Sequence, residues 1–211
     1  MAHHAQLERQ ALCDLLTEVG PEAPTLCEGW RTADLAAHLV LRERRPDAAV
    51  GILVPALAGR TDRVQRRIRD ATPWPDLVRR VRSGPPAPLR PFDELMNTVE
   101  YFIHHEDVRR AGGEQGGGAE PRTLEPDLEQ ALWGRLRPMS KMMLRRAPAG
   151  LVLEAPGYGR HVARRGSPEV TVSGAPGELL LWASGRKQAA RVTLHGPDEA
   201  VAAVERASFG L

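Results

Sequence analysis

The chain has 211 residues, of which 42% are hydrophobic and 27% charged, enough for one large domain or two small ones with real cores. Its 29 basic and 27 acidic residues give a formal net charge of +2, and this near balance argues against a dedicated nucleic-acid binder. The two cysteines show no pairing pattern that would indicate a disulfide framework. The sequence also lacks an apolar run of about 18 residues and a basic start followed by an apolar segment. We therefore expect a soluble, cytoplasmic protein that binds neither membranes nor nucleic acid.

Apolar residues recur at helical spacing through the first half of the chain. The first such stretch carries an apolar residue at every fourth position and ends at Gly20 and Pro21, which commonly follow a helix. A proline-rich stretch at 84–88 indicates a stiff, extended linker. We expect helices at 3–19, 32–45, 59–70, 74–81 and 92–110, with a short helix between 47 and 57.

Glycines crowd the stretch 111–119, and so many glycines cannot hold a helix. After it the pattern changes from helical period to short strands separated by Gly/Pro turns. The sequence thus predicts a mixed fold class: an all-α bundle at 1–112, a glycine-rich linker at 113–120 and a small α+β domain at 121–211. In that second domain we expect helices at 126–146, 178–184 and 198–206, and strands at 151–154, 170–172 and 191–194.

Glu100 and His104 are four residues apart in the predicted helix 92–110, so they lie one turn apart on one face. A carboxylate oxygen and an imidazole nitrogen presented side by side form half of a divalent-metal site, and zinc binds both at about 2.0–2.2 Å. His38, on an otherwise apolar predicted helix, is the candidate third ligand. The same spacing also suits a surface ion pair, and a single histidine among Ala and Leu also suits a buried histidine with a hydrogen-bond partner.

Other residues have two interpretations each. Arg186 offers a bidentate fork for a substrate carboxylate, or it is a solvated residue after a helix-ending glycine. Cys27 is a reactive thiol or a buried inert one. His105 points about 100° away from its neighbour on the helix, so its role stays open. Glu106 and Asp107 are either hydrogen-bond partners of ligand histidines or members of a polar helix face.

Two motifs resemble those of a known family. The stretch 26–39 is similar to the pattern C-x-G-W-x-x-x-D-x-x-A-H-L of the mycothiol-dependent maleylpyruvate isomerase family, which belongs to the DinB-like group of metal-binding four-helix bundles. Glu100-x3-His104-His105 is similar to that family's second motif. The segments LRERRPDAA (41–49) and HHEDVRRA (104–111) further resemble the sequences of an uncharacterised actinobacterial subgroup, whose reaction is not assigned.

The resemblance implies a DinB-like four-helix bundle followed by a domain that looks like a sterol-carrier fold. It implies that His38, Glu100 and His104 hold one divalent metal, usually zinc. It also implies a thiol-using isomerase or transferase, with mycothiol as cosubstrate and a small organic substrate. Two alternatives stay open: a non-catalytic protein that binds a metal and a small molecule, and a metal-dependent hydrolase in which the metal activates water. The sequence sets neither the substrate nor the oligomeric state.

Overall fold

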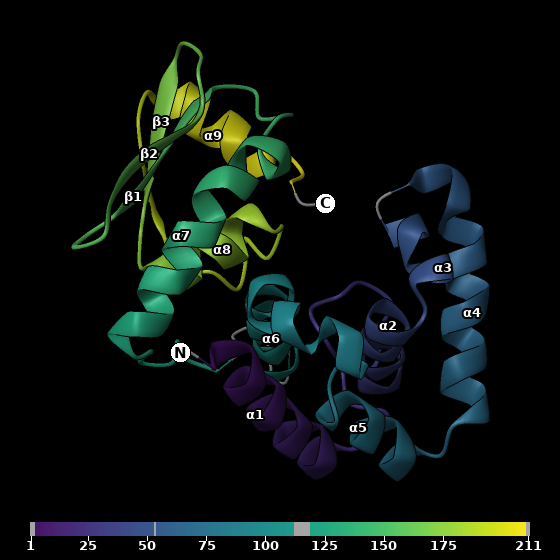
Figure 1. Cartoon of the computed structure of the whole chain (residues 1–211). Coiled ribbons are helices and arrows are strands. Elements are labelled where there is room, and N and C mark those ends of the chain that lie inside the picture. Colours follow the sequence, from purple (N-terminus) through teal and green to yellow (C-terminus); the bar gives the residue numbers. More distant parts are fainter. Residues whose placement is uncertain (1–2, 53, 112–118, 210–211) are drawn as a thin grey trace. The chain divides into compact units, whose positions relative to one another are not determined.

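The computed structural model describes residues 3–52, 54–111 and 119–209 of the chain, which is drawn in Figure 1. The chain divides into two compact units, Met1–Ala119 and Glu120–Leu211, and each is described by itself. Most of the glycine-rich linker predicted at 113–120 lies outside the described residues.

Helices make up the first unit, and the long ones begin and end within one residue of the predicted bounds. The proline-rich stretch differs from the prediction, because part of it forms a 3-10 helix in which the N–H of Leu89 donates to the carbonyl of Pro86 at 2.9 Å. The helices are α1 (His4–Val19), α2 (Thr32–Arg44), α3 (Pro46–Ala49), α4 (Ala58–Ala71), α5 (Trp74–Arg82) and α6 (Asp93–Arg109), with 3-10 helices at Val50–Ile52, Pro55–Leu57 and Ala87–Phe92.

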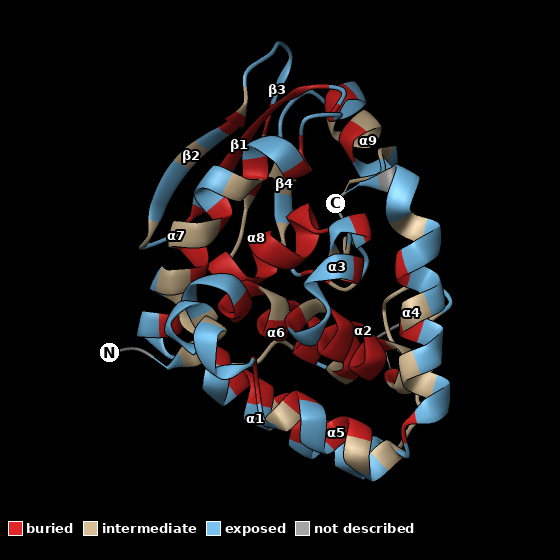
Figure 2. Ribbon diagram, turned by 45° about the vertical axis from the view of Figure 1, so that its right-hand side comes forward, coloured by how far each residue is buried: buried red, intermediate tan, exposed pale blue. Residues whose placement is uncertain are grey.

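The hydrophobic core of this unit lies where α1, α2, α5 and α6 meet. Figure 2 shows the buried residues of α2 and α6 as nearly continuous red stretches. Aliphatic side chains dominate this core, as expected from a sequence with only 4% aromatic residues. Its members are Leu12, Cys13, Leu16, Leu35, Ala36, Ala37, Leu39, Val40, Leu77, Val78, Val81, Tyr101 and Val108.

Hydrogen bonds at the start of α2 fix the position of that helix. The backbone N–H of Arg31 donates to Oδ2 of Asp34 at 3.1 Å, so a carboxylate occupies the positive end of the helix dipole. Asp34 also accepts from Nη1 of Arg69 at 2.6 Å, which ties α4 to α2. Asp34 therefore both caps the start of α2 and anchors α4 to it.

The second unit combines three helices with a four-stranded sheet. The strand order is β2-β1-β3-β4, with β1 parallel to β3 and the other neighbours antiparallel. Helix α7 contacts both α8 and β2, α8 contacts β1, and α9 contacts β3. The elements are α7 (Pro126–Met143), β1 (Gly150–Ala155), β2 (Gly159–Arg164), β3 (Glu169–Ser173), α8 (Pro176–Ala183), β4 (Thr193–His195) and α9 (Asp198–Arg206).

Strand β2 is an element that the sequence did not reveal. It lies at an edge of the four-stranded sheet, where it pairs with β1. Three of its six residues are polar, and its one large apolar side chain, Val162, is exposed while Ala163 is buried. Charged residues are common on edge strands because they discourage pairing with other chains, and they weaken the apolar signal of a strand.

The expectation of a mixed, helix-rich fold with a small sheet is confirmed by these elements. The finer expectations, a DinB-like four-helix bundle and a sterol-carrier-like domain, stay predictions. Within the described ranges, none of the helices has the length and hydropathy needed to cross a membrane.

Helix α1 allows a matched test of the core. Leu12 is fully buried whereas Leu7, on the same helix, is 65% exposed. We expect Leu12→Ala to lower the free energy of unfolding by about 2–5 kcal/mol, because it leaves a cavity among packed side chains. Leu7→Ala should change it by less than about 0.5 kcal/mol. Urea denaturation followed by circular dichroism measures both, and equal effects of the two changes would contradict the described packing.

Candidate metal centre

Three side chains predicted as metal ligands lie together in the first unit. Oε1 of Glu100 is 3.1 Å from Nε2 of His38 and 3.2 Å from Nε2 of His104. The imidazole rings of His38 and His104 meet edge to face, with centroids 5.4 Å apart. The three donor atoms all lie within 4.8 Å of one another. The structure therefore brings His38 of α2 next to the Glu100–His104 pair of α6.

Helical geometry and the core explain why these groups converge. Glu100 and His104 stand one turn apart on α6, so their side chains share a face. His38 stands on α2 between buried apolar neighbours, and α2 packs into the same core as α6. Both histidine side chains are only 10% exposed, whereas the Glu100 side chain is 22% exposed. Glu100 is thus the most exposed of the three side chains.

The donor set fits a divalent metal. Two imidazole nitrogens and one carboxylate oxygen are ligands that zinc prefers. Bonds of about 2.1 Å at a tetrahedral angle would separate neighbouring donors by about 3.4 Å, and the distances of 3.1 and 3.2 Å lie close to that value. These two separations would need to change by only about 0.2–0.3 Å to hold an ion.

Charges at the centre shift the pKa of two groups in opposite directions. Burial alone would raise the pKa of Glu100, but hydrogen bonds from His104 and His38 hold it well below its usual value. Burial alone would lower the pKa of His104, but its contacts with Asp107, Cys27 and Glu100 raise it well above 6.5. A raised pKa favours the imidazolium form of His104 beside the Glu100 carboxylate, and a metal ion bound by Nε2 would replace the proton on that nitrogen.

Asp107 is the second carboxylate at this centre and is completely buried. Its Oδ2 accepts a hydrogen bond from Nδ1 of His104 at 2.9 Å. A carboxylate on the far nitrogen fixes the tautomer and the orientation of a ligand histidine, leaving Nε2 to face the metal. The thiol of Cys27 donates to the same oxygen at 3.1 Å. Of the two interpretations of Asp107, hydrogen bonding to His104 is therefore the one observed.

Two further side chains lie at the centre: Arg42 was not singled out from the sequence, whereas Trp30 is part of the motif at 26–39. Nε of Arg42 lies 3.3 Å from Oε1 of Glu100, and the guanidinium also donates to Oδ1 of Asn97. The centroid of the Trp30 ring lies 5.1 Å from the centroid of the His38 ring. Arg42 follows His38 by four residues, and this i, i+4 spacing is the signal that would have placed both on one face of α2.

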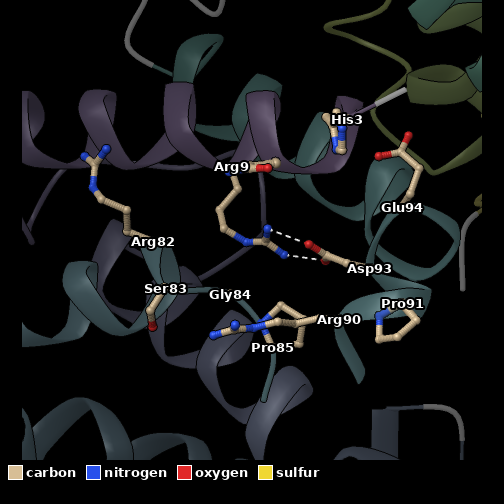
Figure 3. Close-up of a pocket in the computed structure, with 11 residues that line it drawn as sticks. His3, Arg9, Arg82, Ser83, Gly84, Pro85, Arg90, Pro91, Asp93 and Glu94 are labelled. Carbon is tan, nitrogen blue, oxygen red and sulfur yellow. Dashed lines mark hydrogen bonds and ion pairs between the residues drawn. The ribbon is translucent and has the colours of Figure 1, made fainter. Parts of the chain in front are cut away.

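A buried polar network extends from Asn97 toward the start of α1. Nδ2 of Asn97 donates to Glu43 and Asp93, and the guanidinium of Arg9 pairs with the same two carboxylates. Figure 3 shows Arg9 reaching from α1 to Asp93 across a pocket of about 460 Å³. The pocket contains none of the three candidate ligands, and its wall carries charges of both signs. We assign this network to holding α1, α2 and α6 together.

The remaining candidate residues lie elsewhere. His105 is buried, and its Nδ1 is 2.9 Å from Oε2 of Glu8, so it ties α6 to α1. Glu106 pairs with Arg109 of its own helix and with Arg110, the residue that follows the helix. Arg186 belongs to the second unit, where its Nη1 donates to the carbonyl of Ser184 at 2.8 Å. A role for Arg186 in binding substrate stays a prediction.

Comparison with solved structures places the fold among known ones. A crystal structure of the mycothiol-dependent maleylpyruvate isomerase matches with a TM-score of 0.57 and 21% identity, over 90% of each chain. A histidine-to-alanine variant of that enzyme matches with a TM-score of 0.52 and 22% identity, again over 90% of each chain. The chain shares the fold of this isomerase. The sequence matches no protein-family model and no curated protein.

Replacing Asp107 tests the charge balance at this centre. In metal-free protein, Asp107→Asn should lower the pKa of His104, because the amide cannot stabilise the imidazolium as a carboxylate does. Because the pKa of His104 is higher in the folded than in the unfolded chain, its protonation stabilises the fold fully below pH 6.5, and this stabilisation is lost as the pH rises through the folded-state pKa. The variant's loss of free energy of unfolding should therefore be largest on the acidic side of neutrality. Nuclear magnetic resonance titration of the imidazole measures the pKa. Asp14→Asn, which breaks an exposed pair with Arg82, is the control, and an equal shift in both variants would contradict the assignment.

Proposed function

We infer that the protein is a zinc-dependent enzyme that uses a low-molecular-weight thiol, mycothiol, to isomerise or transfer a small organic substrate in the cytoplasm. In this proposal the first unit is a DinB-like four-helix bundle and the second is a sterol-carrier-like domain. The observation that carries the proposal is the convergence of His38, Glu100 and His104 on one point. The shared fold with an enzyme named for its dependence on mycothiol supports the choice of thiol.

The number of ligands supports catalysis over a purely structural metal. Structural zinc sites have four protein ligands, whereas catalytic sites have three and keep one position open. Among the described residues, the group around Glu100 offers three. A zinc ion held there would supply a Lewis acid that stabilises a bound thiol as its thiolate near neutral pH.

The residues around the ligands have defined tasks in this proposal. Asp107 holds His104 through Nδ1, so that Nε2 keeps its lone pair toward the metal. Arg42 holds the Glu100 carboxylate from the side through Nε. Arg186 is the residue we propose for a substrate carboxylate, through the two parallel hydrogen bonds that a guanidinium offers.

Calorimetry with mycothiol tests the function directly. Zinc-loaded protein should bind the thiol and release a proton, which is measured by repeating the titration in buffers of different ionisation enthalpy. Metal-stripped protein and His38→Ala should show no binding. His195→Ala, on the exposed strand β4, is the control and should bind as the unchanged protein does.

Thiol binding that persists without metal would contradict the proposal, and so would zinc-loaded protein that binds no thiol at all. The second result would favour a metal-dependent hydrolase or a non-catalytic metal-binding protein, because water would then be the only ligand of the open position.

A further inference from the structure

We propose a second metal site beside the first, formed by Sγ of Cys27, Nδ1 of His104 and Oδ2 of Asp107, which takes a thiophilic divalent ion such as Cd²⁺ or excess Zn²⁺. These three donor atoms lie within 4.8 Å of one another. The two sites share His104 through its two different nitrogens. The site itself does not depend on the proposed function, whereas its competition with the first site does.

The donor atoms are already close to the separations that a metal requires. Sγ of Cys27 lies 3.1 Å from Oδ2 of Asp107 and 4.0 Å from Nδ1 of His104, and the last two atoms are 2.9 Å apart. Zinc bonds of about 2.3 Å to sulfur and 2.0–2.2 Å to nitrogen and oxygen at tetrahedral angles would separate the donors by about 3.4–3.6 Å. Each separation therefore needs to change by only about 0.5 Å.

The type of donor selects the type of ion. A thiolate favours soft and borderline ions over magnesium or calcium, whereas the first site, with nitrogen and oxygen donors only, lacks this preference. His104 and Asp107 are buried, while Cys27 is half-buried and lines a hollow of about 320 Å³ with Thr25 and Trp30. An ion can therefore reach the thiol from solvent and meet the other two donors behind it.

Binding at the second site changes the protonation of two groups. The S–H bond of Cys27 breaks and its proton goes to solvent, leaving a thiolate that bonds to the ion. The proton on Nδ1 of His104, with which this nitrogen donates a hydrogen bond to Asp107 in the metal-free arrangement, also goes to solvent, and Nε2 keeps its own proton. No electrons are transferred, because the ion keeps its charge and bonds only to lone pairs.

The two metal sites compete because both use His104. Nε2 of His104 faces Oε1 of Glu100 at 3.2 Å, whereas Nδ1 faces Asp107. A neutral imidazole offers one lone pair, so it binds through one nitrogen while the other carries a proton. An ion at the second site therefore takes His104 away from the first. We expect excess of a thiophilic metal to release the ion held by His38 and Glu100.

A cadmium titration separates the two sites, read by the ultraviolet band of charge transfer from thiolate to cadmium. His38→Ala should keep this band, because His38 belongs to the first site only. Cys27→Ser should lose it, with at least tenfold weaker cadmium binding in the His38→Ala background. Cys13→Ser is the control, since Cys13 is fully buried in the core, and it should keep the band.

A band that survives Cys27→Ser, or that is absent from both the unchanged protein and His38→Ala, would overturn the proposal. A second measurement needs no variant: one equivalent of iodoacetamide should alkylate Cys27 before the buried Cys13 and abolish the band. In zinc-loaded protein, excess cadmium should release zinc from the unchanged chain but not after this alkylation. Equal zinc release before and after alkylation would contradict the competition through His104.

Discussion

The carboxylate of Glu100 is the group around which the first unit is arranged. One of its oxygens faces the Nε2 atoms of His38 and His104 and the Nε of Arg42. A partly buried charge is costly unless cations or hydrogen-bond donors surround it. These donors come from α2 and from one turn farther along α6, so the charge is satisfied only while the two helices keep their relative register. The same register brings together the donors that fit a divalent ion.

The polar network around Arg9 maintains that register at another point of the same helices. Arg9 of α1 bonds to Glu43 of α2 and Asp93 of α6, and it stacks over the ring of Tyr101. Asn97 joins these carboxylates to Arg42, which touches Glu100. Paired charges of this kind contribute little net stability, but loss of one member leaves a buried charge without a partner. We therefore regard the network as the support that sets where Glu100 stands.

Periodicity predicted the helices well because their apolar residues repeat every three to four positions, as in α1 and α6. It missed β2, whose polar edge position leaves almost no apolar alternation. Within the site, spacing alone paired Glu100 with His104, since both lie on one helix. The approach of His38, Cys27 and Arg42 depends on how α2 and the loop before it pack against α6, and linear spacing carries no such information. For His38 the prediction rested on its place in an otherwise apolar predicted helix and on the resemblance of the motif at 26–39, and neither gave an indication of Arg42.

The two ring nitrogens of His104 belong to two different groups of metal-binding side chains. One nitrogen belongs to a set of nitrogen and oxygen donors that includes Glu100, and the other faces Asp107 and Cys27. X-ray absorption at the zinc edge, on protein loaded with one equivalent of zinc, tests most directly which of the two donor groups holds the first ion. We expect scattering from two imidazoles, with only nitrogen and oxygen atoms at about 2.0–2.2 Å in the first coordination sphere. A sulfur atom at about 2.3 Å in that first equivalent, or fewer than two imidazoles, would contradict the assignment of His38, Glu100 and His104 as the primary site.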